Sequence, residues 1–169
     1  GWSARREYIT IVIQDILSKS PEDTYFIIEN AAGNGFKIGT TLEELAAIKK
    51  DVGHSRIKFC IDTAHALAGG YEFRTADSAQ QFSEKVETTI GWDNVVAIHL
   101  NDSKVDLGRK RDLHQNIGEG FIGDDGFYSF LSHVPTTIPL LLETPGEHDE
   151  GPNKENIERV QKIIGLIRV

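Results

Sequence analysis

Residues 57–65 read Ile57-Lys-Phe-Cys-Ile-Asp-Thr-Ala-His65, and this stretch decides the fold class. Residues 57–61 form an almost continuous apolar run of strand length. Such a run is typical of a strand covered on both faces, as in a parallel α/β sheet. The run ends in a carboxylate, Asp62, and an imidazole follows three residues later at His65. The stretch therefore predicts a buried parallel strand with metal-binding side chains at its carboxyl end.

The same unit, a buried strand followed by a helix, repeats along the chain. The predicted strands are residues 24–30, 57–61, 95–100 and 138–142. The predicted helices cover residues 5–18, 41–50, 79–90, 127–131 and 157–167. The sequence predicts one α/β domain over residues 1–169, built from about four TIM-barrel-type βα units. Four units are half of an eight-stranded barrel or a small open sheet, and periodicity does not choose between them.

Composition limits the function classes. With one cysteine, Cys60, no internal disulfide can form, and no secretory leader is present, so we expect a cytoplasmic protein. The longest apolar runs have about six residues, which excludes a membrane span. The formal charge of −8 discourages a diffuse electrostatic contact with nucleic acid, so a DNA partner would need bound cations to neutralise the acids. The chain begins at Gly1 and lacks methionine, so we expect a processed product or a piece of a longer protein.

Each predicted strand ends in a residue that can bind a metal. These residues are Glu29, Asp62, His99 and Glu143. Any one of them alone would be explained as a cap or a surface acid. Together they converge, because side chains at the carboxyl ends of parallel strands share one mouth. Like charges repel there unless a cation lies between them, and these nitrogen and oxygen ligands suit Zn, Mn or Fe(II).

The loops supply a second candidate set. His65 lies one turn beyond a strand end, and Asp112 and His114 alternate in an extended segment, so their side chains project to one side. One aspartate and two histidines with an open fourth position suit a catalytic zinc ion. The alternative for Asp112 and His114 is a solvated loop pair.

Other candidates have structural explanations. We expect surface or capping roles for His54, His133 and His148, and a small buried hydrophobe at Cys60. The G-x-G-x-x-G pattern of residues 118–123 follows polar loop rather than a strand, which favours a tight turn beside a site over a dinucleotide site. The glycosylation sequon at 101–103 is idle in the expected compartment.

Several blocks of this sequence resemble the signature blocks of endonuclease IV, the zinc-dependent apurinic/apyrimidinic endonuclease family of base-excision repair. They are Ile28-Glu-Asn-Ala-Ala-Gly-Asn-Gly35, Cys60-Ile-Asp-Thr-Ala-His-Ala-Leu-Ala-Gly-Gly-Tyr71, His99-Leu-Asn-Asp-Ser-Lys104, Asp112-Leu-His-Gln-Asn-Ile-Gly-Glu-Gly-Phe-Ile-Gly123 and Leu142-Glu-Thr-Pro145. They occur in the family's order across most of the chain.

The resemblance implies a xylose-isomerase-like (βα)8 barrel with three zinc ions in its mouth. Such an enzyme cuts duplex DNA on the 5′ side of an abasic site and leaves a 3′-hydroxyl. Carried over by position, Glu29 resembles the carboxylate that bridges two zinc ions, with Asp62, His99 and Glu143 completing one of that pair. The third zinc site is implied at His65, Asp112 and His114, and the resemblance makes Glu29 and Glu143 catalytic.

The departures from the family are specific. Ala64 replaces a cysteine, Leu113 an arginine and Glu72 an aspartate. The first four βα units are missing, with two histidines of the first zinc. The resemblance thus implies the C-terminal half of the barrel, with about two zinc sites retained and impaired activity. Because such a half has open edges, we expect self-association or pairing with the missing N-terminal half.

Two alternatives stay open. A metal-dependent sugar isomerase or epimerase of the same barrel group also uses Glu, Asp, His and Glu ligands, for Mn or Mg, but does not need Asp112 and His114. A non-catalytic metal-binding half-barrel would keep the ligands without the reaction.

Overall fold

Four parallel strands form the central sheet of the computed structural model, which describes residues 2–35 and 37–167. They are β1 (Phe26–Glu29), β2 (Ile57–Asp62), β3 (Val95–His99) and β6 (Leu140–Leu141), and they lie side by side in chain order. Each strand runs parallel to its neighbour, so every connection crosses over through a helical segment. The predicted α/β class with four βα units is confirmed. Residues 1, 36 and 168–169, which include both ends of the predicted domain, lie outside the described residues.

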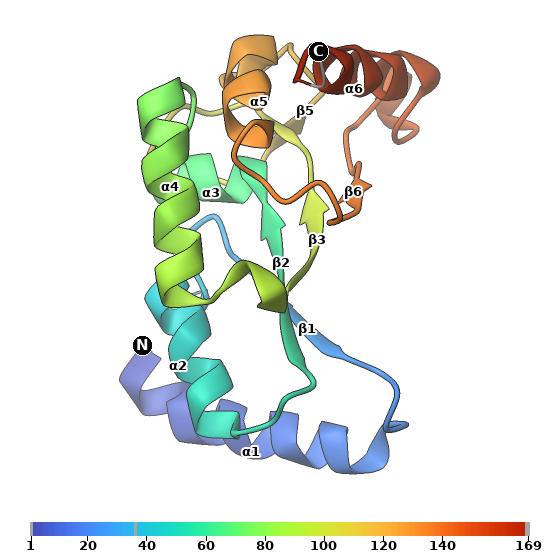
Figure 1. Cartoon of the computed structure of the whole chain (residues 1–169). Helices are drawn as coiled ribbons and strands as arrows, with labels where there is room; N and C mark the ends of the chain where they lie inside the picture. The colour runs from blue at the N-terminus through green and yellow to red at the C-terminus, as the bar shows by residue number, and fades with distance from the viewer. Residues whose placement is uncertain (1, 36, 168–169) are drawn as a thin grey trace.

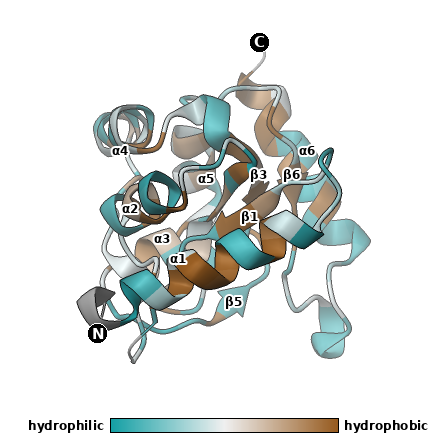
Figure 2. Cartoon of the chain, turned by 90° about the horizontal axis from the view of Figure 1, so that it is seen from below, coloured by the Kyte–Doolittle hydropathy of each residue, from teal (hydrophilic) through white to brown (hydrophobic). Residues whose placement is uncertain are grey.

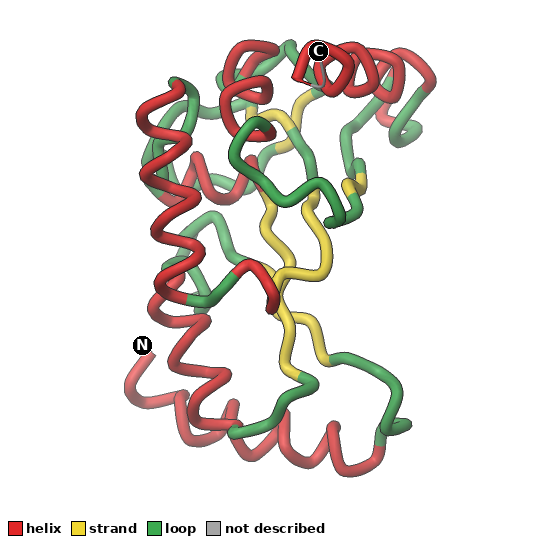
Figure 3. The backbone as a smooth tube through the Cα atoms, in the orientation of Figure 1, coloured by secondary structure: helices red, strands yellow, loops and turns green. Residues whose placement is uncertain are grey.

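The helices follow one another around the sheet. α1 (Trp2–Lys19), α2 (Leu42–Val52), α4 (Ala76–Thr89), α5 (Gly123–Leu131) and α6 (Lys154–Ile167) contact each other in that order. In Figures 1 and 3, α2 and α4 run along one side of the strands, α1 crosses below them, and α5 and α6 lie at the upper end. This order of parallel strands and flanking helices is that of an open part of a (βα) barrel; within the described residues the sheet does not close.

The central strands of the sheet are buried, and the two faces differ in burial at the edge strands. Phe59, Ile61 and Ile98 face the helices and are at most 1% exposed. The register pairs Ile61 with Ile98 and Asp62 with His99, so the alternate residues share the opposite face. On that face the edge-strand residues Ile27 and Leu141 are 49% and 47% exposed. Figure 2 shows that the central strands are mostly hydrophobic, whereas the outer helices carry both hydrophobic and hydrophilic residues.

The helix ends are closed by short polar contacts that the sequence supplies. Thr41 caps α2 by accepting a hydrogen bond from the backbone N–H of Glu44. The Glu44 carboxylate accepts from the N–H groups of Gly39 and Thr40 instead of from that of Thr41, so the capping box that the Thr41–Glu44 spacing favours is only half formed. Thr75 and Ser78 form a complete capping box at the start of α4.

Three segments differ from the sequence prediction: two contain elements where none was predicted, and one predicted strand is shorter. The small-residue stretch after β2 is a helix, α3 (Thr63–Gly69), because Asp62 caps it and Gly70 ends it in the left-handed conformation. The predicted strand 138–142 shortens to β6, which within the described residues has a partner strand on one side only. The predicted polar loop contains a short antiparallel ladder between β4 (Asp102–Ser103) and β5 (His114–Gln115).

The remaining short elements are the 3-10 turns η1 (Trp92–Asn94) and η2 (Glu147–Asp149). The apolar side chains of α1 are only partly buried: Ile13 and Leu17 are in the core, whereas Ile16 is 40% exposed. The reason is that α1 flanks the edge strand and has one main helical neighbour, α2. None of the described helices combines the length and the apolar character that crossing a bilayer requires.

Candidate metal centre

The carboxyl ends of the strands bring together the first candidate set. The register places Asp62 beside His99, and Glu29 next to Cys60, on the face away from the helices. Glu143 follows β6 by two residues and joins the same mouth. One ligand atom from each of Glu29, Asp62, His99 and Glu143 lies within 4.8 Å of the others. Four residues from four strands or strand ends thus lie close enough together to share one metal ion.

The imidazole of His99 stands between two carboxylates of this set. Its Nδ1 lies 3.4 Å from Oε1 of Glu29 and 3.2 Å from Oε2 of Glu143. The nitrogen is buried, yet neither contact has hydrogen-bond geometry. A buried polar atom without a partner is costly, and a cation between these three side chains would satisfy it.

A second set adjoins the first. Ligand atoms of Asp62, His65 and His114 lie within 4.8 Å of one another. Oδ1 of Asp112 lies 2.9 Å from Nε2 of His65 and 3.8 Å from Nε2 of His114. Asp62 therefore borders both sets, whereas the sequence assigned it to one.

Backbone carbonyls orient the two imidazoles of the second set. Nδ1 of His114 is 3.2 Å from the carbonyl oxygen of Glu143, and Nδ1 of His65 is 2.9 Å from that of Asn30. A carbonyl oxygen only accepts, so each Nδ1 carries a proton, and Nε2 is the ring atom that is left to face a metal ion. Nε2 of His114 is buried and lacks a hydrogen bond. This arrangement of a backbone acceptor behind an imidazole is the one that metal-binding histidines use.

Local structure explains why these side chains meet. Asp62 ends β2 and caps α3 by accepting from the N–H of His65, so the first turn of α3 holds His65 over the strand end. The β4–β5 ladder pairs His114 with Ser103, which returns the long loop to the mouth. The backbone N–H of Lys104 donates to the carbonyl of Leu113, the residue between Asp112 and His114. This hydrogen bond extends the same ladder.

The pKa shifts of the residues in the mouth show that a positive charge there is stabilised by the surrounding carboxylates. Burial raises the pKa of the fully buried Asp62 carboxyl, although His65 and His114 oppose this. Burial also acts to raise the pKa of Glu29, but His65 and His99 outweigh it and the net shift is downward. Burial acts to lower the pKa of His65, yet Glu29, Asp62 and Asp112 raise it to about 10. Without an ion, a charged His65 therefore supplies the positive charge.

The donor set fits a borderline divalent ion such as zinc. It contains carboxylate oxygens and imidazole nitrogens, two of which lack a partner. Cys60 lies beneath the mouth and is 3% exposed. Burial raises the pKa of its thiol to about 12, so it stays protonated and is a small buried hydrophobe, as expected.

The structure brings all the predicted site residues into one mouth: Glu29, Asp62, His65, His99, Asp112, His114 and Glu143. Their metal-binding and catalytic roles stay predictions. The other histidines lie elsewhere. His54 is exposed and accepts from the N–H of Arg56, His148 is exposed beside Glu147, and His133 is half-buried at the end of α5.

Four buried polar residues around the mouth were not predicted from the sequence: Asn30, Thr63, Asn101 and Asp102, each at most 4% exposed. Asn30 and Asn101 hydrogen-bond to Asp62 and tie the strand ends together. Their positions in the sequence could have indicated a supporting role, because each of the four follows a strand-end ligand by one to three residues. Burial of Asn101 also shows why the sequon at 101–103 cannot carry a glycan in the folded chain.

Asp102 explains the glycine pattern of residues 118–123. Its carboxylate accepts from the N–H groups of Ser103, Gly118, Gly120, Ile122 and Gly123 at 2.8–3.2 Å. A Cβ on Gly120 would overlap Oδ1 of Asp102. The glycines therefore let the loop wrap a buried carboxylate, in agreement with the tight turn that the sequence analysis favoured.

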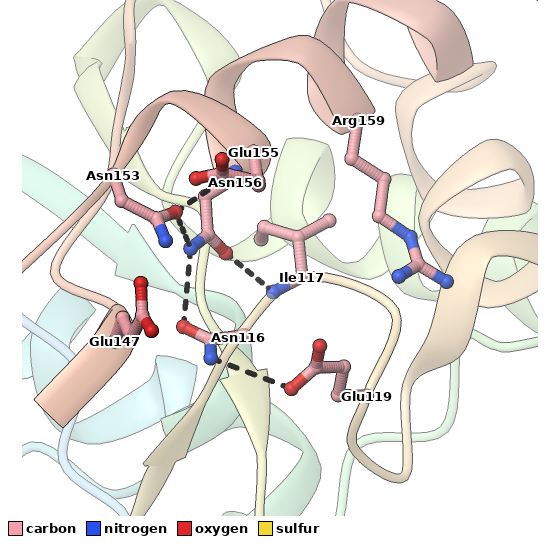
Figure 4. Close-up of a pocket in the computed structure, with 8 residues that line it drawn as sticks. All are labelled: Asn116, Ile117, Glu119, Glu147, Asn153, Glu155, Asn156 and Arg159. Atoms are coloured by element: carbon pink, nitrogen blue, oxygen red, sulfur yellow. Dashed lines mark hydrogen bonds between the residues drawn. The ribbon is translucent and has the colours of Figure 1, made fainter.

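A surface hollow of about 360 Å³ lies beside this loop but is not part of the mouth. Figure 4 shows its residues, which include none of the predicted ligands. Its buried Asn156 accepts from the N–H of Ile117 and donates to Oδ1 of Asn116, which in turn accepts from the N–H of Gly146. These amides hold the segment after β5 against the loop that follows Glu143.

The strand order, the helical crossovers and the cluster at the carboxyl ends define a partial (βα) barrel. The sequence pattern of the xylose isomerase-like TIM barrel family matches residues 13–164, and the chain belongs to this family.

Similarity to individual proteins indicates a particular group within this family. Probable endonuclease 4 of Haloarcula marismortui is 38% identical over 146 residues, covering 86% of this chain and 52% of that protein. Apurinic-apyrimidinic endonuclease 1 of Saccharomyces cerevisiae is 40% identical over 147 residues, covering 82% and 39%. The crystal structure of endonuclease IV from Thermus thermophilus superposes with a TM-score of 0.81 at 28% identity, covering 96% of this chain and 58% of that one. The chain spans about half the length of the curated relatives it matches.

Proposed function

We propose that this chain is the C-terminal, metal-binding half of a zinc-dependent apurinic/apyrimidinic endonuclease of base-excision repair. The observation that carries the proposal is the pair of adjoining ligand sets that meet at Asp62. Similarity to proteins named endonuclease 4 and apurinic-apyrimidinic endonuclease 1 supports the same reaction class. A sugar isomerase needs only the first set, so the approach of Asp112 to His65 favours the endonuclease.

The two sets would hold two zinc ions. Glu29, Asp62, His99 and Glu143 would hold one, and His65, Asp112 and His114 the other. Bound zinc supplies Lewis-acid polarisation of the phosphate and activation of water at neutral pH. The resemblance to endonuclease IV also implies a third ion, for which Glu29 would be one ligand.

The reaction is hydrolysis of the phosphodiester on the 5′ side of an abasic site. Water attacks the phosphorus, the bond to the 3′ oxygen breaks, and that oxygen leaves as a 3′-hydroxyl after taking up a proton. Glu29 and Glu143 have side chains that are 33% and 49% exposed, whereas Asp62 is fully buried. The two glutamates are therefore the carboxylates of the first set that an incoming phosphodiester meets, and we assign them the catalytic roles.

The substrate class we propose is abasic-site duplex DNA. The acidic mouth would repel it, but two dications would neutralise four carboxylate charges locally. The loop between β4 and β5 adds exposed cations at Lys104, Arg109, Lys110 and Arg111. Access to cellular DNA agrees with the cytoplasmic location expected from the sequence.

The test uses a labelled duplex with one abasic site, incubated with zinc. We expect the isolated chain to be at or near background, because removing one electrostatic contact already costs a factor of about 10²–10³ and this chain lacks several that its longer relatives can supply. A fusion of the N-terminal half of Thermus thermophilus endonuclease IV to this chain should nick the duplex. Glu29→Gln and Glu143→Gln should abolish nicking, and Glu119→Gln, in the hollow outside the mouth, is the matched control.

Two outcomes would overturn the proposal. A folded fusion that binds zinc but does not nick would favour a non-catalytic half-barrel. Interconversion of aldose and ketose sugars with Mn or Mg, in the absence of nicking, would favour the isomerase.

A further inference from the structure

A buried amide, Asn101, joins two of the candidate ligands across the mouth. Its Nδ2 donates to Oδ2 of Asp62 at 2.7 Å, and its Oδ1 accepts from the backbone N–H of Glu143 at 2.8 Å. Asn101 is 0% exposed and follows β3, so it stands between the end of β2 and the segment after β6. One side chain therefore sets the position of a carboxylate on one side and of a backbone unit on the other.

The chemistry of the two partners requires an amide here. A carboxylate at 101 would place two acceptors against Asp62, and an apolar side chain would leave the Glu143 N–H without an acceptor. A flipped amide would place its oxygen against the Asp62 carboxylate and its NH₂ group against the Glu143 N–H. The two partners therefore fix the orientation of the Asn101 amide.

The backbone of Asn101 is locked as well. Oγ1 of the buried Thr63 donates to the carbonyl of Asn101 at 2.7 Å and accepts from its N–H at 2.9 Å. Thr63 directly follows Asp62. Asn101, which holds the Asp62 carboxylate, is thus itself held by Thr63, the residue next to Asp62. These hydrogen bonds fix both the backbone and the side chain of Asn101.

We infer that Asn101 is a positioning residue for the metal centre: it aims the Asp62 carboxylate and fixes its separation from Glu143. The expected effect on metal affinity rests on the proposed function. The effect on the positions of Asp62 and Glu143 rests on the geometry alone. Outer hydrogen-bond partners of ligands typically contribute a factor of 10–100 to metal affinity, and we expect about this loss when the Asn101 amide is removed.

The chain offers a matched control in Asn30. This amide is also buried, at 4% exposed, and it also links two strand ends. It donates to the carbonyl of Asp62 at 3.1 Å and accepts from the Asp62 N–H at 2.7 Å, without touching the carboxylate. Both amides support the fold, but only Asn101 holds a ligand atom.

The experiment compares the 169-residue chain with its Asn101→Ala and Asn30→Ala variants. Zinc affinity is measured by competition with a chromophoric chelator, and ligand geometry by the visible absorption spectrum of bound Co²⁺. We expect Asn101→Ala to lower affinity about 10- to 100-fold and to change the Co²⁺ spectrum. Asn30→Ala should lower thermal stability while keeping the wild-type spectrum. Equal effects of the two variants on affinity and spectrum would overturn the inference.

A metal-free readout separates this inference from the proposed function. In the apo chain, hydrogen exchange at the Glu143 amide should be faster in Asn101→Ala than in the wild type, because its acceptor is gone. Unchanged exchange would overturn the inference, even if zinc binds. Failure of the wild type to bind zinc, with faster exchange in the variant, would overturn the proposed function and leave the positioning geometry intact.

A second variant covers failure of Asn101→Ala to fold. Asn101→Asp keeps the shape and the acceptor for Glu143 but removes the donor to Asp62. It should retain slow exchange at Glu143 and still show an altered Co²⁺ spectrum. A wild-type spectrum in this variant would mean that the contact with Asp62 has no positioning role.

Discussion

Oδ2 of Asp62 lies 3.4 Å from Nε2 of His114, although one residue ends a central strand and the other lies on a loop ladder. The contact places Asp62 on the border between the two ligand sets. A substitution at Asp62 should therefore affect both sets, whereas one at His99 or His114 should affect its own.

Zinc content tests this relationship. We predict about two zinc ions per chain after dialysis against dilute zinc, measured by elemental analysis. His114→Ala should lose one ion, and Asp62→Ala should reduce binding at both sites. Bound zinc that is unchanged by His114→Ala would contradict the assignment of the second set.

The turn around Asp102 predicts an effect on stability. In Gly120→Ala the added methyl would overlap the Asp102 carboxylate and the Ser103 carbonyl, and overpacking of this kind costs about 1–3 kcal/mol. The control is Gly165→Ala in α6, where no atom lies within 4 Å of the added carbon. That change should stabilise the chain by about 0.5–1 kcal/mol, because alanine loses less entropy in a helix. Urea unfolding of both variants measures the difference, and similar values would be evidence against the tight turn.

The Glu72–Arg74 pair predicts a dependence of stability on pH. Hydrogen bonds from Arg74 hold the pKa of Glu72 below its ordinary value of 4.5. A depressed pKa in the folded state stabilises the fold above the unfolded-state pKa, and this contribution is lost as the pH falls through the folded-state value.

We therefore expect the stability difference between wild type and Glu72→Gln to be largest near neutral pH and to shrink below about pH 4.5. Unfolding free energies measured across this range give the result. In an Arg74→Gln background the same difference should depend less on pH, because only the backbone N–H groups of residues 73 and 74 still donate to the Glu72 carboxylate. A difference that grows on acidification would reverse the sign and exclude the pairing as its cause.

The uncovered face of the sheet predicts association. Ile27 and Leu141 are about half exposed on the edge strands β1 and β6, each of which has one neighbour within the described residues. Exposed edges and apolar faces promote pairing, so we predict that the chain self-associates at micromolar concentration. Sedimentation velocity should show that Ile27→Lys shifts the distribution toward monomer. Leu166→Lys on α6 should not, although Leu166 is 60% exposed. A monomeric wild type with a cooperative melt would contradict this prediction.

Much of the fold could be predicted because hydrophobic patterning is a local property. The runs before Asp62 and His99 predicted β2 and β3 closely, and the order of elements predicted parallel strands. Prediction failed where neighbours decide the outcome. α3 formed because the Asp62 side chain caps it, and the strand predicted at 138–142 shortened because β6 lies at an edge with no partner beyond it in the described part of the chain.

The sequence by itself determined which side chains stand at the strand ends, because residue order and strand direction place Glu29, Asp62 and His99 at the carboxyl edge. Only the tertiary structure decided that Asp62 borders both ligand sets and that Asn101 and Thr63 hold it there. These relationships join segments far apart in the chain through hydrogen bonds of 2.7–2.9 Å. No local pattern encodes such contacts, since they exist only once the strands are packed in register.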